Sequence, residues 1–247
     1  MNGGRAAVFI FFFSLKIVMA QNVVLNTWVL DSSVNRAVQI HSAAIGENSQ
    51  LYNGSQNKET ELRSYDTGHP YFVTNDWSVG NINYGNHTYQ GAYILYDIIL
   101  DKVIIENPYS NNRIQLAKDK VSTFSMAGHN FVRLDSGQSS SRSNMGSGFY
   151  DVLYDGAAKF YARRTKEVEI KIENGLRKKI FVVKNRYFIF RDKAFLPVSS
   201  KSSVLDAFED QRAGIKSEMA NIKMPYRKNR ELIISRLAKA YDELKAK

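Results

Sequence analysis

The chain of 247 residues contains no cysteine and only four histidines. Without cysteine the protein can form neither a disulfide framework nor a metal site built from thiolates. The sequence also lacks a Gly-x-Ser-x-Gly nucleophile elbow and a glycine-rich phosphate loop followed by Lys-Ser or Lys-Thr. No local motif for catalysis, for a metal or for a nucleotide remains, and we predict no cofactor.

The histidines do not form a metal-binding motif. They are His41, His69, His87 and His129, and no two of them are spaced by one or by four residues. A local zinc clamp needs such short spacings on one strand or helix. The last three fall in predicted turns, where histidine is usually a surface residue.

Two further patterns could supply catalytic groups. Ser55 and Lys58 have the Ser-x-x-Lys spacing of acyl-transfer enzymes, but the companion Ser-Asp-Asn and Lys-Thr-Gly elements are absent. Carboxylates that bracket apolar stretches could act as the acid and base of glycoside hydrolysis. The candidates are Asp97, Asp101, Asp151 and Asp155. An aspartate at a strand end more often forms a turn, which favours a structural role.

The formal net charge of +10 is unevenly distributed. Residues 21–156 carry 9 basic and 13 acidic side chains, whereas residues 157–247 carry 23 basic and 11 acidic side chains. Such a basic region can attract anionic lipid, polysaccharide, nucleic acid or an acidic protein, or it can simply be a solvated lysine-rich surface. The candidate contacts with an anionic surface are Arg163, Arg164, Lys178, Lys179, Arg227, Lys228 and Arg230.

Residues 1–20 have the three parts of a secretory signal peptide. Arg5 gives a positive start, residues 6–15 are apolar, and small residues precede a cleavage site between Ala20 and Gln21. The apolar run is about half the roughly 20 residues that span a bilayer, and Lys16 interrupts it. We predict a mature chain without a transmembrane segment. An exported protein without disulfides points to a bacterial periplasm or exterior.

Residues 21–198 are predicted to form a β-rich domain. Short runs rich in Val, Ile, Tyr and Phe alternate with Gly, Asn, Asp and Ser clusters. The clearest strands are residues 93–99, 102–106, 121–126, 130–134, 149–154, 159–164, 168–172, 180–183 and 187–191. Short connections favour an antiparallel meander, with hairpin turns at residues 153–156 and 184–186. The fold class is α+β, predominantly β, as a curved sheet, a sandwich or an open barrel.

Two local patterns refine this prediction. In the strand 159–164, Phe160 and Ala162 alternate with Lys159, Tyr161 and Arg163, which indicates one solvated face. Residues 136–148 form a flexible loop rich in Ser and Gly, which either separates two domains or lies within one sheet. The similar character of the flanking strands favours the second arrangement.

Residues 199–247 are predicted to be a tail of two or three α-helices. A capping box at Ser203 and Asp206 begins a short helix, and residues 212–221 form a second one. Residues 229–244 place Ile233, Leu237, Tyr241 and Leu244 on one face of a third helix. We expect the tail to pack on an end or edge of the sheet and to shield a strand edge.

The segment Gly-Phe-Tyr-Asp-Val-Leu-Tyr-Asp-Gly at residues 148–156 resembles part of a family of exported bacterial proteins without an assigned activity. The other similar positions are Lys159, Tyr161, Ala162, Arg163, Arg164 and the segments 186–191, 195–198 and 200–203. The resemblance covers residues 51–247 and implies export and a shared fold. It implies no activity, and no functional residue is carried over.

Three functions remain open. The first is a non-enzymatic envelope protein that binds an envelope protein, glycan or lipid. The second is a periplasmic hydrolase acting on a glycan or lipid, which would gather histidines and aspartates in one aromatic-lined pocket. The third is a β-cavity for a small apolar ligand. Aromatic residues interleaved with basic ones could stack on bases, but export argues against nucleic acid.

Overall fold

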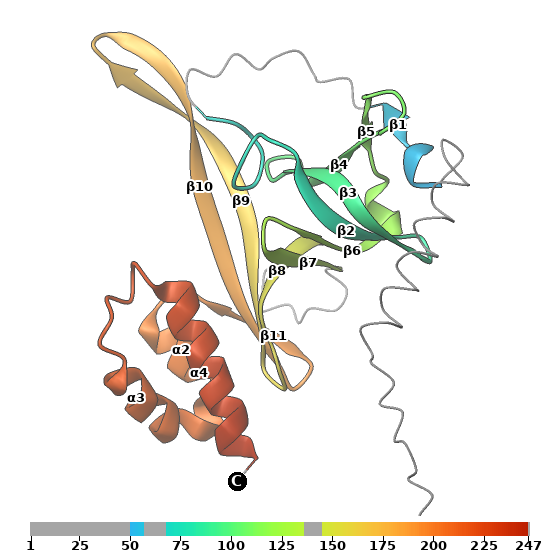
Figure 1. The fold of residues 1–247 in the computed structure, drawn as a ribbon. Helices are drawn as coiled ribbons and strands as arrows, with labels where there is room; N and C mark the ends of the chain where they lie inside the picture. Colours follow the sequence, from blue (N-terminus) through green and yellow to red (C-terminus); the bar gives the residue numbers. More distant parts are fainter. Residues whose placement is uncertain (1–49, 57–67, 136–144, 247) are drawn as a thin grey trace, which may run out of the picture. The chain divides into compact units, whose positions relative to one another are not determined.

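The computed structural model describes residues 50–56, 68–135 and 145–246. Within them the chain forms one antiparallel sheet of eleven strands and three α-helices, so the predicted fold class is confirmed (Figure 1). The sheet is open, with β1 and β11 at its two ends. It is a curved meander and neither a closed barrel nor a sandwich. The signal cleavage site at Ala20 and Gln21 lies outside the described residues.

The strands are in the order β1-β5-β4-β3-β2-β6-β7-β8-β9-β10-β11. Strands β2 to β5 run back toward β1, so β1 pairs with β5 and β6 pairs with β2, and from β6 onward the chain continues as a plain meander. The bounds are β1 Ser55–Gln56, β2 Ser78–Tyr84, β3 His87–Asp97, β4 Lys102–Glu106, β5 Arg113–Gln115, β6 Val121–Met126, β7 His129–Leu134, β8 Gly148–Asp155, β9 Lys159–Glu173, β10 Leu176–Arg191 and β11 Ala194–Val198.

β9 and β10 differ from the prediction, which divided each of them into two strands. Asn185 pairs with Arg164 inside the ladder, so the predicted turn at residues 184–186 is wrong. The actual turn is Asn174-Gly175, where both residues have positive φ angles, 52° and 76°. An Asn-Gly pair with two positive φ angles is the turn that two-residue hairpins favour. The chain therefore forms one long hairpin of two strands where the sequence suggested four short strands.

The C-terminal helices are α2 Lys201–Ala207, α3 Arg212–Asn221 and α4 Arg230–Lys245. The capping box of α2 is formed by Ser200 and Ser203, three residues before the predicted one, because Ser203 is the third helical residue and not the cap. Short 3-10 helices occupy Gln50–Tyr52, Lys118–Lys120 and Glu209–Gln211. No helix among the described residues is long and apolar enough to cross a membrane.

The helices pack on one face of the sheet, at the end formed by β8 to β11. Phe160, Ala162, Tyr187 and Ile189 share one face of β9 and β10 and are buried against α2, α3 and α4. The opposite face is also covered, since Tyr161 packs in a second apolar cluster and is only 7% exposed. The predicted solvated face at the start of β9 is therefore wrong.

The main core lies under β2 to β8 and is rich in aromatic side chains. Tyr96, Phe124, Phe131 and Phe149 contact one another with ring centroids 4.7–5.9 Å apart. Aromatic pairs of this geometry stabilise a core beyond their buried area. β7 and β8, which precede and follow residues 136–147 in the chain, pair directly with each other in the sheet.

Candidate functional site

The outer part of the β9–β10 hairpin consists of residues 166–173 and 176–183, and we call it the arm. Among the described residues, the strands of the arm pair only with each other, because β8 reaches only Ala162 of β9 and β11 reaches only Tyr187 of β10. Figure 1 shows this long hairpin, with the helices beside the opposite end from its turn. The arm thus leaves the main sheet with both strand edges unpaired by any described strand.

One face of the arm combines aliphatic side chains with cations. Directly paired residues of an antiparallel ladder point to the same face. The pairs on this face are Ile172 with Arg177, Ile170 with Lys179, Val168 with Phe181, and Lys166 with Val183. Ile172 is 73% exposed, Ile170 is 55% exposed and Val183 is 56% exposed. We call these eight residues the basic-apolar face, and they include no acidic side chain.

The acidic residues of the arm lie on the other face, where cations partner most of them. Glu173 accepts a hydrogen bond from Lys178 at 2.8 Å, and Glu169 lies 3.1 Å from Lys184. The hydrogen bond from Lys178 lowers the pKa of Glu173 below its ordinary value. The acidic side chains of the arm are therefore confined to this face, where Glu173 and Glu169 each have a lysine partner.

The base of the arm is tied to a segment that precedes β2. Lys166 Nζ donates hydrogen bonds to the carbonyl oxygens of His69, at 2.9 Å, and Tyr71, at 2.6 Å. Burial lowers the pKa of Lys166. Gly68 approaches Phe181 so closely that a Cβ atom there would lie 3.1 Å from the ring. These contacts fix the base of the arm, beyond which the aliphatic side chains become exposed.

Arg164, one of the predicted surface contacts, lies inside the protein and is 6% exposed. Its Nη2 donates to Asp151 Oδ2 at 2.6 Å and to Glu231 Oε2 at 3.0 Å, while Tyr187 donates to Glu231 at 2.7 Å. Burial by itself would lower the pKa of Arg164, but the hydrogen bond to Glu231 and the charge of Asp151 outweigh it and raise the pKa. This cluster joins β8, β9 and α4.

Arg163 also points inward, to the opposite face of β9. It binds Asp101 at 2.8 Å and donates to the Phe149 carbonyl oxygen at 2.6 Å. Tyr96 and Lys118 bind the same carboxylate. Burial would raise the pKa of Asp101, but its partners, above all Arg163, outweigh burial and lower it. Arg163 and Arg164 are therefore structural ion-pair residues and do not form a surface patch.

The other five predicted contacts lie in two places. Lys178 and Lys179 are on the arm, on opposite faces. Arg227 and Lys228 are exposed in the turn before α4, and Arg230 packs its guanidinium over the rings of Tyr187 and Tyr226. The seven residues do not form one surface. The aliphatic side chains that flank the arm cations were not among the predicted contacts, although their two-residue alternation is visible in the sequence.

Of the histidines that the structure describes, His129 contacts an aspartate side chain. Its Nδ1 lies 2.8 Å from Asp151 Oδ2, and the rings of Phe72 and Phe131 are beside it. Arg164 donates to the same carboxylate oxygen, so the pair of His129 and Asp151 is part of the ion-pair cluster.

The remaining candidates are dispersed. Asp97 accepts hydrogen bonds from the backbone of Ile99 and Leu100, so it forms a turn. Asp155 forms an exposed ion pair with Lys159. Ser55 is exposed in β1, whereas Lys58 and His41 lie outside the described residues. No cluster of three metal-ligating side chains occurs in the part of the chain that the structure describes.

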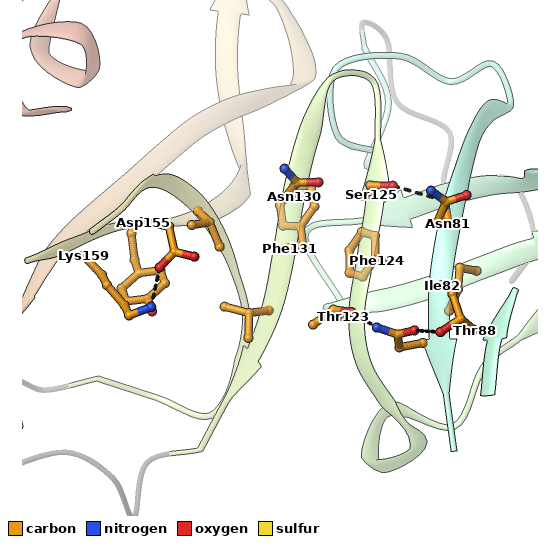
Figure 2. A pocket seen from close by; sticks show the side chains of 14 residues that line it. Asn81, Ile82, Thr88, Thr123, Phe124, Ser125, Asn130, Phe131, Asp155 and Lys159 are labelled. Carbon is orange, nitrogen blue, oxygen red and sulfur yellow. Dashed lines mark hydrogen bonds and ion pairs between the residues drawn. The ribbon is translucent and has the colours of Figure 1, made fainter. Parts of the chain in front are cut away.

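A pocket of about 390 Å³ lies on the sheet between β2, β6 and β7 and the β8–β9 turn (Figure 2). Asn83 Nδ2 donates to Thr123 at 2.6 Å, and Thr88 donates to Asn83 Oδ1 at 2.5 Å. The ion pair of Asp155 and Lys159 forms the other side (Figure 2). These polar groups of the pocket wall therefore already bind one another.

No protein-family model, no curated protein and no solved structure matches the chain. The resemblance of residues 51–247 to exported bacterial proteins stays a prediction from the sequence.

Proposed function

We propose that the protein is an exported, non-enzymatic envelope protein that binds another envelope component through the basic-apolar face of the arm. The observation that carries this proposal is the exposure of Ile170 and Ile172 on one face of the arm. Exposed apolar patches on soluble domains mark interaction sites. The N-terminal signal pattern supports a location in a bacterial periplasm or exterior.

The lowered pKa values of two carboxylates support a binding role over a hydrolase. A general acid in a glycosidase needs a raised pKa so that it keeps a proton at neutral pH. Asp101 and Glu231 have lowered pKa values, because hydrogen bonds from Arg163 and Arg164 outweigh the effect of burial. Such groups stay ionised and serve as anchors for the sheet and for α4.

Photo-crosslinking from a single position tests the proposal. The chain has no cysteine, so Ile172→Cys provides one attachment site for a benzophenone label at the end of the arm. Leu232→Cys is the matched control, because Leu232 is also exposed, at 59%, but lies on α4. In the envelope fraction of the host, we expect crosslinks from position 172 and few from position 232. Equal yields from both positions would refute the arm as the binding surface.

Processing tests the location separately. N-terminal sequencing of the protein from the periplasmic or secreted fraction should begin at Gln21. Intact residues 1–20 on protein recovered from the cytosol would contradict export.

A further inference from the structure

We infer that the pocket drawn in Figure 2 binds a neutral saccharide ring. The inference goes beyond the proposed function and does not rest on the arm, because no residue of the arm lines this pocket. The pocket volume of about 390 Å³ is at the small end of the range of roughly 300–1,000 Å³ that small-molecule sites occupy. This size suits a ligand of one ring better than a long chain.

The polar half of the pocket is built by cross-strand pairing. Directly paired residues of an antiparallel ladder point to the same face of the sheet. Thr88 pairs with Asn83, and Asn83 pairs with Thr123, which gives one row of polar side chains across β3, β2 and β6. Ser125 pairs with Asn130 across β6 and β7, which gives a second row. Amide and hydroxyl groups from four strands therefore gather on one face.

The hydrogen bonds within the polar half orient its groups and leave capacity for a ligand (Figure 2). Asn83 Nδ2 donates to Thr123 at 2.6 Å, and Asn83 Oδ1 accepts from Thr88 at 2.5 Å. A side-chain amide carries two hydrogens on its nitrogen and two lone pairs on its oxygen, so one of each stays available. Asn130 is exposed, and its amide group has no partner among the described residues. Groups that both donate and accept match the hydroxyl groups of a sugar.

The neighbouring strands supply the apolar half of the pocket. Val132 pairs with Thr123, so it continues the first polar row onto β7. Val152 pairs with Tyr161 across β8 and β9, and both line the pocket. A pyranose ring carries hydroxyl groups around its rim and C–H groups on its faces. Its C–H face can pack on the valines, which removes apolar surface from water, while its hydroxyl groups reach the amides.

The charges of the pocket compensate each other. Of the residues that line it, the charged ones are Asp155 and Lys159, and these form an ion pair. A charged ligand therefore finds no unpaired opposite charge among the lining residues. An apolar ligand would cover the amide and hydroxyl groups without giving them partners, which is costly. A neutral ligand with several hydroxyl groups meets both conditions.

Saccharide titrations followed by amide NMR test the inference on the full chain. The probes are the methyl glycosides of glucose, galactose, mannose and N-acetylglucosamine. At least one probe should shift the amide signals of residues 81–83, 123–125 and 130 in a saturable way. No saturable shift with any of the four probes, or shifts confined to other parts of the chain, would overturn the inference.

Two matched asparagine variants separate the pocket from general effects. Asn130→Ala removes an exposed amide that lines the pocket, and Asn112→Ala removes an exposed amide outside it. Loss of one hydrogen bond to the ligand should weaken binding about threefold to tenfold in the first variant. The second variant should bind like the unchanged chain. Equal affinities of the two variants would overturn the inference.

The apolar half has its own variant. Val152→Thr keeps a β-branched residue in β8 and replaces one methyl group by a hydroxyl group, so it should weaken binding about fourfold. The melting temperature of this variant, measured in parallel, shows whether the domain stays folded at the temperature of the titration. Unchanged affinity would overturn the packing of a sugar ring on this wall.

The salt dependence tests the neutrality of the ligand. Affinity for the probe that binds should stay the same when the salt rises from about 0.1 M to about 1 M, because screening acts on unpaired charges and the pocket has a compensated pair. A marked loss of affinity at high salt would assign the pocket to a charged ligand and overturn the inference.

The inference and the proposed function fail separately. The pocket variants leave the arm unchanged, so crosslinking from position 172 does not depend on saccharide binding. If no probe binds while position 172 still crosslinks, the saccharide inference fails and the proposed function stands. If a probe binds in the pocket while positions 172 and 232 crosslink equally, the proposed function fails and the saccharide inference stands.

Discussion

Arg163 and Arg164 are consecutive residues of β9, and their guanidinium groups bind carboxylates on opposite faces of the sheet. Arg163 lies 2.8 Å from Asp101, and Arg164 lies 2.6 Å from Asp151. Successive side chains of a strand point to opposite faces, so two adjacent arginines can reach two separate layers. Together they fix the base of the long hairpin, and the exposed arm begins just beyond them.

Removing the Arg164 side chain should strongly destabilise the fold. Arg164→Met leaves Asp151, which is 0% exposed, without its guanidinium partner. Breaking a buried ion pair in this way costs about 3–5 kcal/mol. The matched control is Arg177→Met on the exposed arm, which should change the free energy of unfolding by less than about 0.5 kcal/mol. Urea denaturation measures both, and similar values for the two variants would contradict the structural role of Arg164.

Stability should decrease in acid through Glu231. Burial alone would raise the pKa of this carboxyl, but hydrogen bonds from Arg164 and Tyr187 outweigh it and lower the pKa. A group with a lowered pKa in the folded state stabilises the fold above its unfolded pKa, about 4.3 for glutamate, and this contribution is lost as the pH falls through the folded value. The free energy of unfolding of Glu231→Gln should therefore depend less on pH below about 4.3 than that of the unchanged chain. Parallel curves for the two proteins would contradict this explanation.

Gly148, the first residue of β8, and Gly146, two residues before it, give a matched pair of variants. Gly148 has a φ of 154°, and a Cβ atom there would lie 2.2 Å from the Arg163 guanidinium and 2.4 Å from Asp101. A Cβ atom at Gly146 would have no neighbouring atom within 4 Å. Gly148→Ala should lower the melting temperature by several degrees, since about 1 kcal/mol shifts it by about 2–4 °C in a domain of this size. Gly146→Ala should have little effect, and a reversed order would show that this packing is wrong.

The arm should open without unfolding of the whole protein. Its strands pair only with each other among the described residues, and isolated two-stranded hairpins are marginally stable. Amide hydrogen exchange should be faster for residues 168–173 and 176–182 than for residues 159–163. Uniform protection along β9 would show that the arm is held more firmly than its pairing implies.

Strands that are flanked by turn residues were predicted from the sequence, whereas the two long strands β9 and β10 were each predicted as two shorter strands. Lys102–Glu106 and Val121–Met126 match their predicted bounds, because turn residues flank alternating apolar runs. β9 and β10 were predicted in pieces, because Lys184-Asn185-Arg186 looks like a turn by composition. Asn185 lies in the ladder opposite Arg164, a long-range pairing that local propensity does not detect.

The candidate surface was predicted only in part, for a related physical reason. The prediction from positive charge included Lys178 and Lys179, which lie on the arm. It also included Arg163 and Arg164, whose carboxylate partners are distant in sequence. Asp101 is 62 residues from Arg163, and Glu231 is 67 residues from Arg164. A single sequence shows which residues are charged and not which of them become paired when the sheet forms.

Fluorescence from two neighbouring positions tests the central claim most directly. Ile172→Cys and Lys171→Cys each give one labelling site for an environment-sensitive dye, and the two side chains lie on opposite faces of the arm. On addition of membranes prepared from the host envelope, the dye at position 172 should shift to shorter wavelength and resist an aqueous quencher, while the dye at position 171 changes little. No change at position 172, or equal changes at both positions, would contradict binding through the basic-apolar face.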